Sequence, residues 1–128
     1  PLVMAPAGQG AAYGSLGDAE QIVPLVRLAR ELGADIIKAD PTDNPADFHR
    51  VVEAARCPTL VRGGGKGEIG AVLHKSALLM AQGASGMVYG RNVYQHAHPA
   101  RVVAALMAII HQGASGADAL ALYQQTDA

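Results

Sequence analysis

The feature that most limits the fold of this chain is a unit that occurs four times. Each unit has a short apolar run, a loop rich in small residues, glycine or proline, and a segment with apolar residues at helical spacing. The apolar runs are residues 2–6, 35–39, 59–62 and 86–89, and the helical segments are about 18–32, 45–55, 69–81 and 99–111, with a weaker one at 117–124. Strands that alternate with helices form parallel sheets through right-handed crossovers. The sequence therefore predicts an α/β protein with a parallel sheet.

The ends of three helical segments resemble one another, which indicates repeated βα units. They read Leu32-Gly33-Ala34-Asp35, Gln82-Gly83-Ala84-Ser85 and Gln112-Gly113-Ala114-Ser115. We expect each glycine to end its helix in the left-handed conformation. Such repeats suit a barrel, but a (β/α)8 TIM barrel needs about 200–250 residues and this chain has 128. We expect a single domain over residues 1–128 that forms half a barrel, left by truncation or paired with another half.

Composition excludes several classes of protein. Half of the residues are hydrophobic and 16% are charged, as in a globular domain, and the net charge of −1 gives no footprint for nucleic acid or an anionic membrane. The single cysteine, Cys57, excludes an internal disulfide and fits a reducing compartment. No leader or membrane-spanning run is visible, so the expected location is cytoplasmic. The open edges of a half-barrel sheet predict association, as a homo-oligomer or with a missing N-terminal half.

Lys38 is the first candidate for chemistry. It follows the apolar pair Ile36 and Ile37 at the expected end of a buried strand. Burial disfavours the charged form of a lysine, and a neutral amine can condense with a ketone or aldehyde. The alternative is a strand end whose amine reaches water. Other segments must decide between the two.

Two later loops favour an anionic ligand. Residues 62–66 read Arg-Gly-Gly-Gly-Lys, and residues 90–92 read Gly-Arg-Asn, each after an expected strand. Bare backbone N–H groups, a helix N-terminus and cationic side chains can hold a phosphate, and barrels place one between the loops after their last two strands. The alternative for the glycine run is a flexible turn.

Three segments together resemble the archaeal-type class I fructose-bisphosphate aldolase family, which includes a thiolase branch acting on a phosphorylated dione. They are residues 33–38, residues 62–66 and residues 83–95, the last with Gly-Met-Val-Tyr-Gly-Arg-Asn-Val-Tyr-Gln at its end. The resemblance implies a TIM barrel of which strands five to eight are present, without a cofactor or metal. It implies that Lys38 forms a Schiff base with a substrate ketone. It also implies that Gly63, Gly64, Gly90 and Arg91 bind the substrate phosphate, and that the protein is a homo-oligomer. Arg62 replaces the small polar residue usual before the glycine pair, and we expect it to join the phosphate site.

The residue that transfers protons is left open. In the resembled aldolases a tyrosine precedes the proline at the end of strand five, whereas this chain has Ala5 before Pro6. Asp40 and Tyr13 are candidates to replace it, although both can be ordinary loop residues. His96 and His98 are spaced like a metal pair, but no carboxylate or thiol is grouped with them, so we expect surface or capping roles.

The expected function is that of a Schiff-base aldolase, a lyase of carbohydrate metabolism that acts on a phosphorylated ketose or ketone. One alternative is a phospho-dione thiolase, an acyltransferase that also uses Lys38. A second alternative is a non-catalytic half-barrel that binds phosphate, which the abrupt start at Pro1 favours for this chain taken alone.

Overall fold

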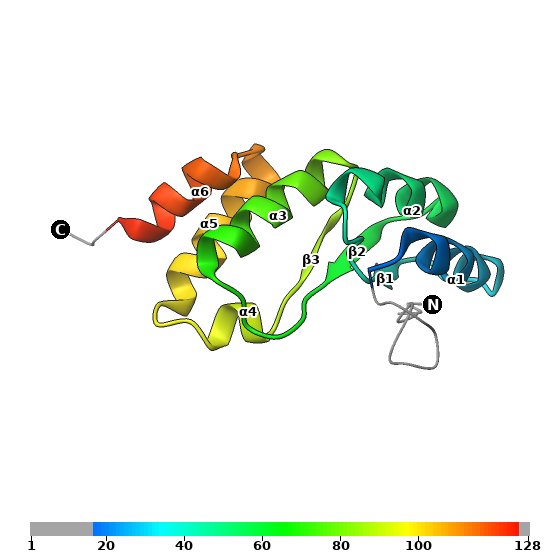
Figure 1. The fold of residues 1–128 in the computed structure, drawn as a ribbon, viewed down its shortest axis with the longest axis horizontal. Coiled ribbons are helices and arrows are strands. Elements are labelled where there is room, and N and C mark those ends of the chain that lie inside the picture. The colour runs from blue at the N-terminus through cyan, green and yellow to red at the C-terminus, as the bar shows by residue number, and fades with distance from the viewer. Residues whose placement is uncertain (1–16, 126–128) are drawn as a thin grey trace.

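The computed structural model describes residues 17–125, and its helices and strands alternate along the chain (Figure 1). The strands are β1 (Ile37–Ala39), β2 (Thr59–Arg62) and β3 (Gly86–Val88). The helices are α1 (Ala19–Glu31), the 3-10 helix η2 (Pro45–Asp47), α2 (Phe48–Ala55), α3 (Ile69–Ala81), α4 (Arg91–Tyr94), α5 (Pro99–Gln112) and α6 (Gly116–Gln124). The predicted strand at residues 2–6 lies outside the described residues.

The strands within residues 17–125 form one parallel sheet in the order β1-β2-β3. The register aligns Lys38 with Leu60 and Ala39 with Val61, and it aligns Val61 with Met87. Each pair of neighbouring strands is joined through a helix, as parallel pairing requires. The predicted α/β class with a parallel sheet is therefore confirmed.

The helices begin and end at residues that satisfy their free backbone groups. Asp18 caps α1 through the backbone N–H of Glu20, and Asn44 caps η2 through that of Ala46. All three predicted glycine turns are confirmed, because Gly33, Gly83 and Gly113 have φ values of 96°, 103° and 67°. A side chain on Cβ would strain the backbone at each of these turns.

Two local expectations were wrong. Residues 90–97 were expected to form a loop, but residues 91–94 form the short helix α4, whose backbone N–H groups at Val93 and Tyr94 donate to Gly90 O. The helix expected over 45–55 begins instead as the 3-10 turn η2 and becomes α-helical at Phe48. The 3-10 turn lies at a helix start, where such turns are common, and α4 is a separate single turn that ends before α5 begins.

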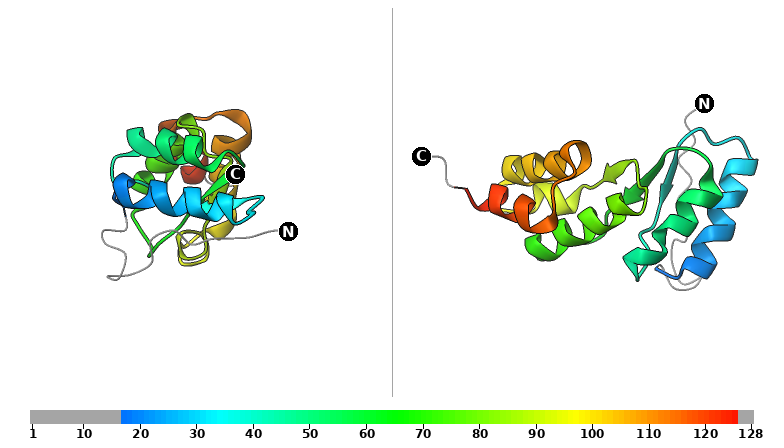
Figure 2. Two further views of the ribbon diagram at one scale, coloured as in Figure 1. Left: turned by 90° about the vertical axis from the view of Figure 1, so that its right-hand side faces the viewer. Right: turned by 90° about the horizontal axis from the view of Figure 1, so that it is seen from above.

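Two apolar clusters hold the sheet and helices together along an elongated molecule, with α1 and α2 at one end and α5 and α6 at the other (Figures 1 and 2). The first cluster joins the sheet to α1, α2 and α3 through residues that include Ile22, Ile37, Phe48, Val61 and Leu79. The second joins α3, α5 and α6 through Leu73, Val102, Leu106, Ile109 and Ala119. The helices α1, α2 and α3 therefore cover one face of the sheet, and α5 and α6 pack against α3.

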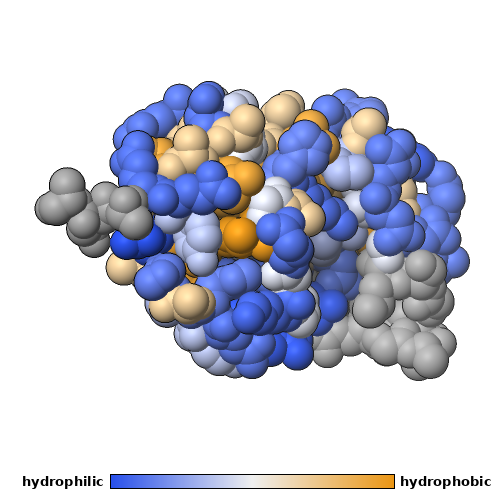
Figure 3. Space-filling model, turned by 60° about the vertical axis from the view of Figure 1, so that its left-hand side comes forward, coloured by the Kyte–Doolittle hydropathy of each residue, from blue (hydrophilic) through white to orange (hydrophobic). Residues whose placement is uncertain are grey.

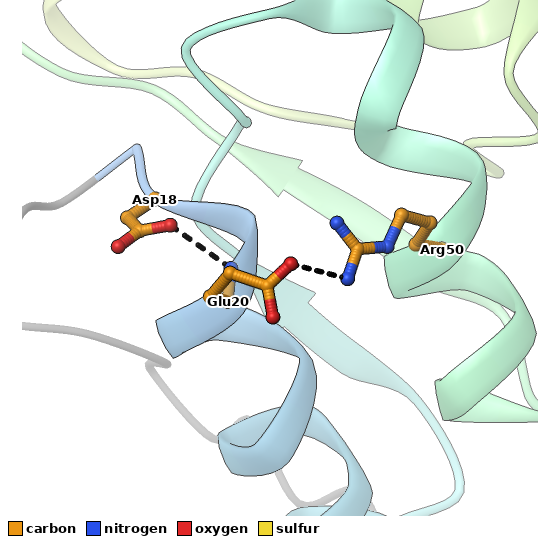
Figure 4. A network of polar contacts seen from close by, with 3 residues as sticks. All are labelled: Asp18, Glu20 and Arg50. Carbon is orange, nitrogen blue, oxygen red and sulfur yellow. Dashed lines mark hydrogen bonds and ion pairs between the residues drawn. The ribbon is translucent and has the colours of Figure 1, made fainter.

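A polar network fixes the start of α1 against α2 (Figure 4). Arg50 on α2 donates to Glu20 Oε1 at 2.6 Å, and the N-terminal backbone of α1 is capped by Asp18. The hydrogen bond and the charge of Glu20 raise the pKa of the Arg50 guanidinium above its usual range. These contacts lie beside the loop that follows β1, so they help to position it.

Several large apolar side chains remain on the surface, and hydrophobic residues are visible among hydrophilic ones on the side that carries α5 and α6 (Figure 3). Leu28 and Leu32 lie on or just after α1, and Val103 and Met107 lie on α5, with exposures of 51%, 76%, 46% and 48%. These two helices flank the described molecule at opposite ends. None of the helices found within residues 17–125 is both long and apolar enough to cross a membrane.

Candidate functional site

The two faces of the sheet differ in what covers them. Ile37 and Ala39 of β1 are fully buried in the cluster beneath the helices. Because side chains alternate along a strand, Lys38 between them lies on the opposite face, and it is half-buried. Lys38 therefore points away from the helices, near the carboxyl end of β1.

Asp40 and Arg62 form an ion pair at the carboxyl ends of β1 and β2. Arg62 Nε donates to Asp40 Oδ1, and the side chains are 25% and 2% exposed respectively. The register that aligns Ala39 with Val61 places these two residues opposite each other. Asp40 lies two residues after Lys38, so the pair shares the face of the sheet that carries the lysine.

The groups around Asp40 act on the pKa of its carboxyl in opposite directions. Burial raises the pKa of the Asp40 carboxyl, while the hydrogen bond and charge of Arg62 and the charge of Lys38 lower it, and the net result is a raised pKa. The second oxygen, Oδ2, is buried and has no hydrogen-bond partner among residues 17–125. A buried carboxylate oxygen without a partner costs stability unless something else satisfies it.

A cavity of about 290 Å³ opens beside this ion pair at the carboxyl edge of the sheet. Its wall includes Asp40, Arg62, Gly63, Gly64, Lys75 and Asn92. A larger hollow of about 660 Å³ lies between α1 and α2 and is lined by residues such as Arg27, Glu31 and Glu53. We place the candidate site in the smaller cavity, because parallel α/β sheets bind ligands at the carboxyl ends of their strands.

The glycine loop after β2 is open at one residue and packed at another. A Cβ at Gly64 would meet no atom within 4 Å, whereas a Cβ at Gly63 would lie 3.0 Å from Tyr89 Cδ1. Gly63 N also donates to Val88 O at 3.0 Å, which extends the pairing of β2 with β3. The loop therefore leaves its backbone accessible at Gly64 while Gly63 fixes its path.

Asn92 joins the two loops that the sequence singled out. It is 7% exposed, and its Oδ1 accepts a hydrogen bond from Gly67 N at 2.8 Å. Arg91 extends toward the same loop, with Nη1 4.0 Å from the position of a Cβ at Gly65. Gly90, the N-cap of α4, lies next to Arg91. The structure thus brings Arg62, Gly63, Gly64, Gly90 and Arg91 to one edge of the sheet.

The expectation that the N-terminus of α3 is free to receive a phosphate was wrong at two of its N–H groups. Gly70 N and Ala71 N both donate to the carboxylate of Glu68 at 2.8 Å. These backbone bonds lower the pKa of Glu68. A negative side chain of the protein itself already occupies this helix end, so anion binding has to rely on the glycine backbone and the cationic side chains.

Sequence reasoning missed Lys75 and Tyr89, which both line the cavity. Lys75 is the one Lys or Arg in the segment Ile69–Ala81, which is otherwise mostly apolar. This isolated positive charge is the sequence signal that could have identified Lys75. Tyr89 OH lies 2.9 Å from Ser76 Oγ, and burial raises the pKa of the Tyr89 phenol. Tyr13, the other proton-transfer candidate, lies outside the described residues.

Within the part of the chain that the structure describes, no group of three or more His, Cys, Asp or Glu side chains is placed to hold a metal ion. His96 lies near Glu68, whose pKa its charge lowers slightly. His98 is exposed at the start of α5. Lys38 is not among the residues that line the cavity, whose walls supply the buried Asp40 carboxyl, the Arg62 guanidinium and the Lys75 amine.

Comparisons with known proteins find relatives that match most of this chain. The chain is 38% identical over 104 residues to 2-amino-3,7-dideoxy-D-threo-hept-6-ulosonate synthase of Halobacterium salinarum, covering 81% of this chain and 39% of that protein. It is 34% identical over 97 residues to 3-hydroxy-5-phosphonooxypentane-2,4-dione thiolase of Shigella flexneri, covering 76% of this chain and 37% of that protein. The chain therefore spans about two-fifths of the length of these curated relatives.

A solved structure is similar over most of the chain. It is an archaeal fructose-1,6-bisphosphate aldolase with its catalytic lysine covalently bound to the carbinolamine intermediate of the substrate. The TM-score is 0.78 at 27% identity, over 85% of this chain and 45% of that one. The model of the family described as DeoC/LacD family aldolase matches residues 1–96. The resemblance seen in the sequence is confirmed, and the chain belongs to the DeoC/LacD family of aldolases.

Proposed function

We propose that the intact protein is a Schiff-base aldolase that acts on a phosphorylated ketose or ketone, with Lys38 as the amine that attacks the carbonyl. The observation that carries this proposal is the position of Lys38, at the carboxyl end of β1 on the face turned away from the helices. A lysine there can meet a ligand held at the edge of the sheet. The relative with a covalently bound catalytic lysine supports the same chemistry.

The chemistry has two parts. The neutral amine of Lys38 adds to the ketone carbon, and loss of water leaves an iminium ion that withdraws electrons from the adjacent carbon–carbon bond. Cleavage of that bond releases an aldehyde and leaves an enamine on Lys38. Binding energy from a remote phosphate would hold the ketone in a reactive position.

For the phosphate we propose the edge formed by Arg62, Gly63, Gly64, Gly90 and Arg91. The accessible backbone at Gly64 and the cationic side chains of Arg91 and Lys75 support this. Arg62 lines the cavity but has its Nε occupied by Asp40, so its remaining guanidinium N–H groups would face the ligand.

For assembly, we propose that further βα units complete a (β/α)8 barrel in which the strands of this chain are the last four. The exposed apolar residues on α1 and α5, at the two ends of the molecule, support packing against such units or in a homo-oligomer. We also propose a cytoplasmic location, which the single cysteine supports.

Borohydride reduction of the intact protein with dihydroxyacetone phosphate or fructose 1,6-bisphosphate tests the proposal. We expect mass analysis of peptides to find the reduced adduct on Lys38, and Lys38→Arg to abolish it. Lys66→Arg, an exposed lysine, should leave the adduct unchanged. Absence of any adduct on Lys38 would overturn the proposed function.

The phosphate site has a separate test. Gly64→Ala adds a methyl group where the structure has open space, so we expect the unfolding temperature to stay the same while the KM for the phosphorylated ketone rises about tenfold. A KM within twofold of the unsubstituted protein would exclude Gly64 from phosphate binding.

A second candidate is a thiolase that transfers an acyl group from a phosphorylated dione to coenzyme A. The specific observation in its favour is the 34% identity to a phospho-dione thiolase. Turnover of 3-hydroxy-5-phosphonooxypentane-2,4-dione with coenzyme A, without retro-aldol cleavage of fructose 1,6-bisphosphate, would favour this alternative.

A further inference from the structure

Asp40 carries an oxygen that has no hydrogen-bond partner in the part of the chain that the structure describes. Its carboxyl is 2% exposed and lines the cavity at the end of β1. Oδ1 accepts from Arg62, while Oδ2 is buried without a hydrogen-bond partner among residues 17–125. A structural ion pair would be expected to satisfy both oxygens, since an unmade hydrogen bond on a buried charged group is costly. The free oxygen is therefore available to a ligand.

The position of this oxygen relates it to Lys38. Asp40 directly follows β1 and lies two positions after Lys38, so in extended backbone their Cα atoms are about 7 Å apart. The charge of Lys38 acts on the Asp40 carboxyl. A ketone carbon bonded to the lysine nitrogen would thus lie within reach of a carboxyl on the same strand.

We propose that Asp40 transfers protons through Oδ2 during Schiff-base and enamine formation at Lys38, and that Arg62 is its positioning residue. This inference rests on the proposed function, because it assigns a group to the same site. Arg62 fixes the carboxyl by binding Oδ1, which directs the other oxygen to the ligand.

The proton transfers balance over the half-reaction. After the Lys38 amine has added to the ketone, Asp40 in its acid form donates a proton to the carbinolamine hydroxyl. Water leaves, and the nitrogen lone pair forms the C=N bond of the iminium ion. The Asp40 carboxylate then removes a proton from the adjacent carbon, whose C–H electron pair becomes the C=C bond of the enamine. Asp40 thereby returns to its acid form, and the reverse transfer protonates an enamine left by cleavage.

The groups around Asp40 allow it to act both as an acid and as a base. Burial raises its pKa from the usual carboxyl value, and the cations Lys38, from its own strand, and Arg62, from β2, limit that rise. The cavity is also lined by Lys75 of α3, Asp43 of the loop that follows β1, and Tyr89 after β3. A carboxyl with a raised pKa keeps its proton to a higher pH than an exposed carboxyl, and its ionised form is a stronger base.

The test measures exchange of the carbon-bound hydrogen of dihydroxyacetone phosphate with deuterated water in the intact protein, beside borohydride trapping. We expect Asp40→Asn to slow the trapping of the adduct on Lys38 without abolishing it, and to lower the exchange rate about 100-fold. Asp40→Glu should recover part of the rate. Asp47→Asn, a carboxyl on η2 outside the cavity, is the matched control and should exchange normally.

The pH dependence of the exchange rate separates a chemical role of Asp40 from a structural one. In the unsubstituted protein the exchange rate should fall as pH drops through the raised pKa of Asp40, and this limb should be absent in Asp40→Asn. Arg62→Lys keeps a cation beside Asp40 but changes its geometry, so it should slow exchange about tenfold and move the limb. Arg62→Lys carries the test alone if Asp40→Asn does not fold.

The possible failures are distinct. No adduct in the unsubstituted protein refutes the proposed function. An adduct in both proteins, with exchange in Asp40→Asn within threefold of normal, refutes only the role of Asp40. An unchanged rate and pH limb in Arg62→Lys refutes the positioning role of Arg62.

Discussion

Asp40 and Arg62 stand opposite each other at the ends of β1 and β2, and each changes what the other can do. Arg62 supplies the positive charge that makes a buried carboxyl tolerable, and Asp40 holds the guanidinium at the cavity wall. Around them, Lys38, Lys75 and Arg91 keep the edge of the sheet cationic. The character of the site at the scale of single residues is therefore one buried acid among several cations.

Removing Arg62 alone should destabilise the protein more than removing both charges of this pair. We expect Arg62→Gln to lower the free energy of unfolding at pH 7 by about 1–3 kcal/mol, because Asp40 is left buried without its counter-ion. Adding Asp40→Asn to that variant should recover much of the loss, since asparagine carries no charge. Urea denaturation of the three proteins measures both effects. A loss below about 0.5 kcal/mol for Arg62→Gln would show that the pair contributes little.

The sequence predicted the members of this site but not their pairing. Lys38 and Arg62 could be placed at strand ends because apolar runs precede them. The contact between Asp40 and Arg62, which are 22 positions apart, depends on the register of β1 against β2, and local patterns do not determine that register. Lys75 was missed because a helical position says little about which cavity a side chain reaches.

At the scale of elements, the start of α3 shows how a side chain can take the place expected for a ligand. Glu68 accepts bonds from two first-turn N–H groups and so stabilises the positive end of the helix. The bounds of α3 and β2 match the prediction because their apolar spacing and flanking glycines are clear. Two other features could not be predicted from the sequence. Residues 91–94 form a helix that is too short to show a helical spacing of apolar residues. Arg56 ends α2 with a φ of 51°, where no glycine signals the turn.

The cap at Glu68 should make the stability of α3 depend on pH. Because the folded state lowers the pKa of Glu68 from 4.5, its contribution is present above that value and is lost as pH falls through the lower, folded pKa. We expect Glu68→Gln to have a lower urea midpoint than the unsubstituted protein at pH 7, and the difference to close near pH 3. Glu53→Gln, on the exposed side of α2, serves as the control. An equal difference at both pH values would contradict a charge-dependent cap.

At the scale of the whole molecule, the exposed apolar side chains are concentrated on the flanking helices. Leu28, Leu32, Val103 and Met107 account for much of this surface. The helices between them bury their apolar faces against the sheet and against one another. This distribution suits a layer that continues beyond α1 and α5 in the intact protein.

A charge on the outer side of α5 tests that continuation. We expect Met107→Glu to destabilise the intact protein by about 2 kcal/mol, because the glutamate would be buried against a neighbouring unit. Leu122→Glu, a similarly exposed position on α6 at 38%, should change stability by less than about 0.5 kcal/mol. Thermal unfolding and sedimentation of both variants report stability and assembly. Equal, small effects would mean that α5 faces solvent.

The hydrogen bond from Gly67 N to Asn92 Oδ1 has a consequence for the thermodynamics of recognition. It couples segments from two consecutive βα units before any ligand arrives, so their relative order is established during folding. A ligand gripped by both segments then loses less conformational entropy on association. Substitution of Asn92 would accordingly change affinity by loosening this coupling, in addition to any contact that Asn92 makes from the cavity wall.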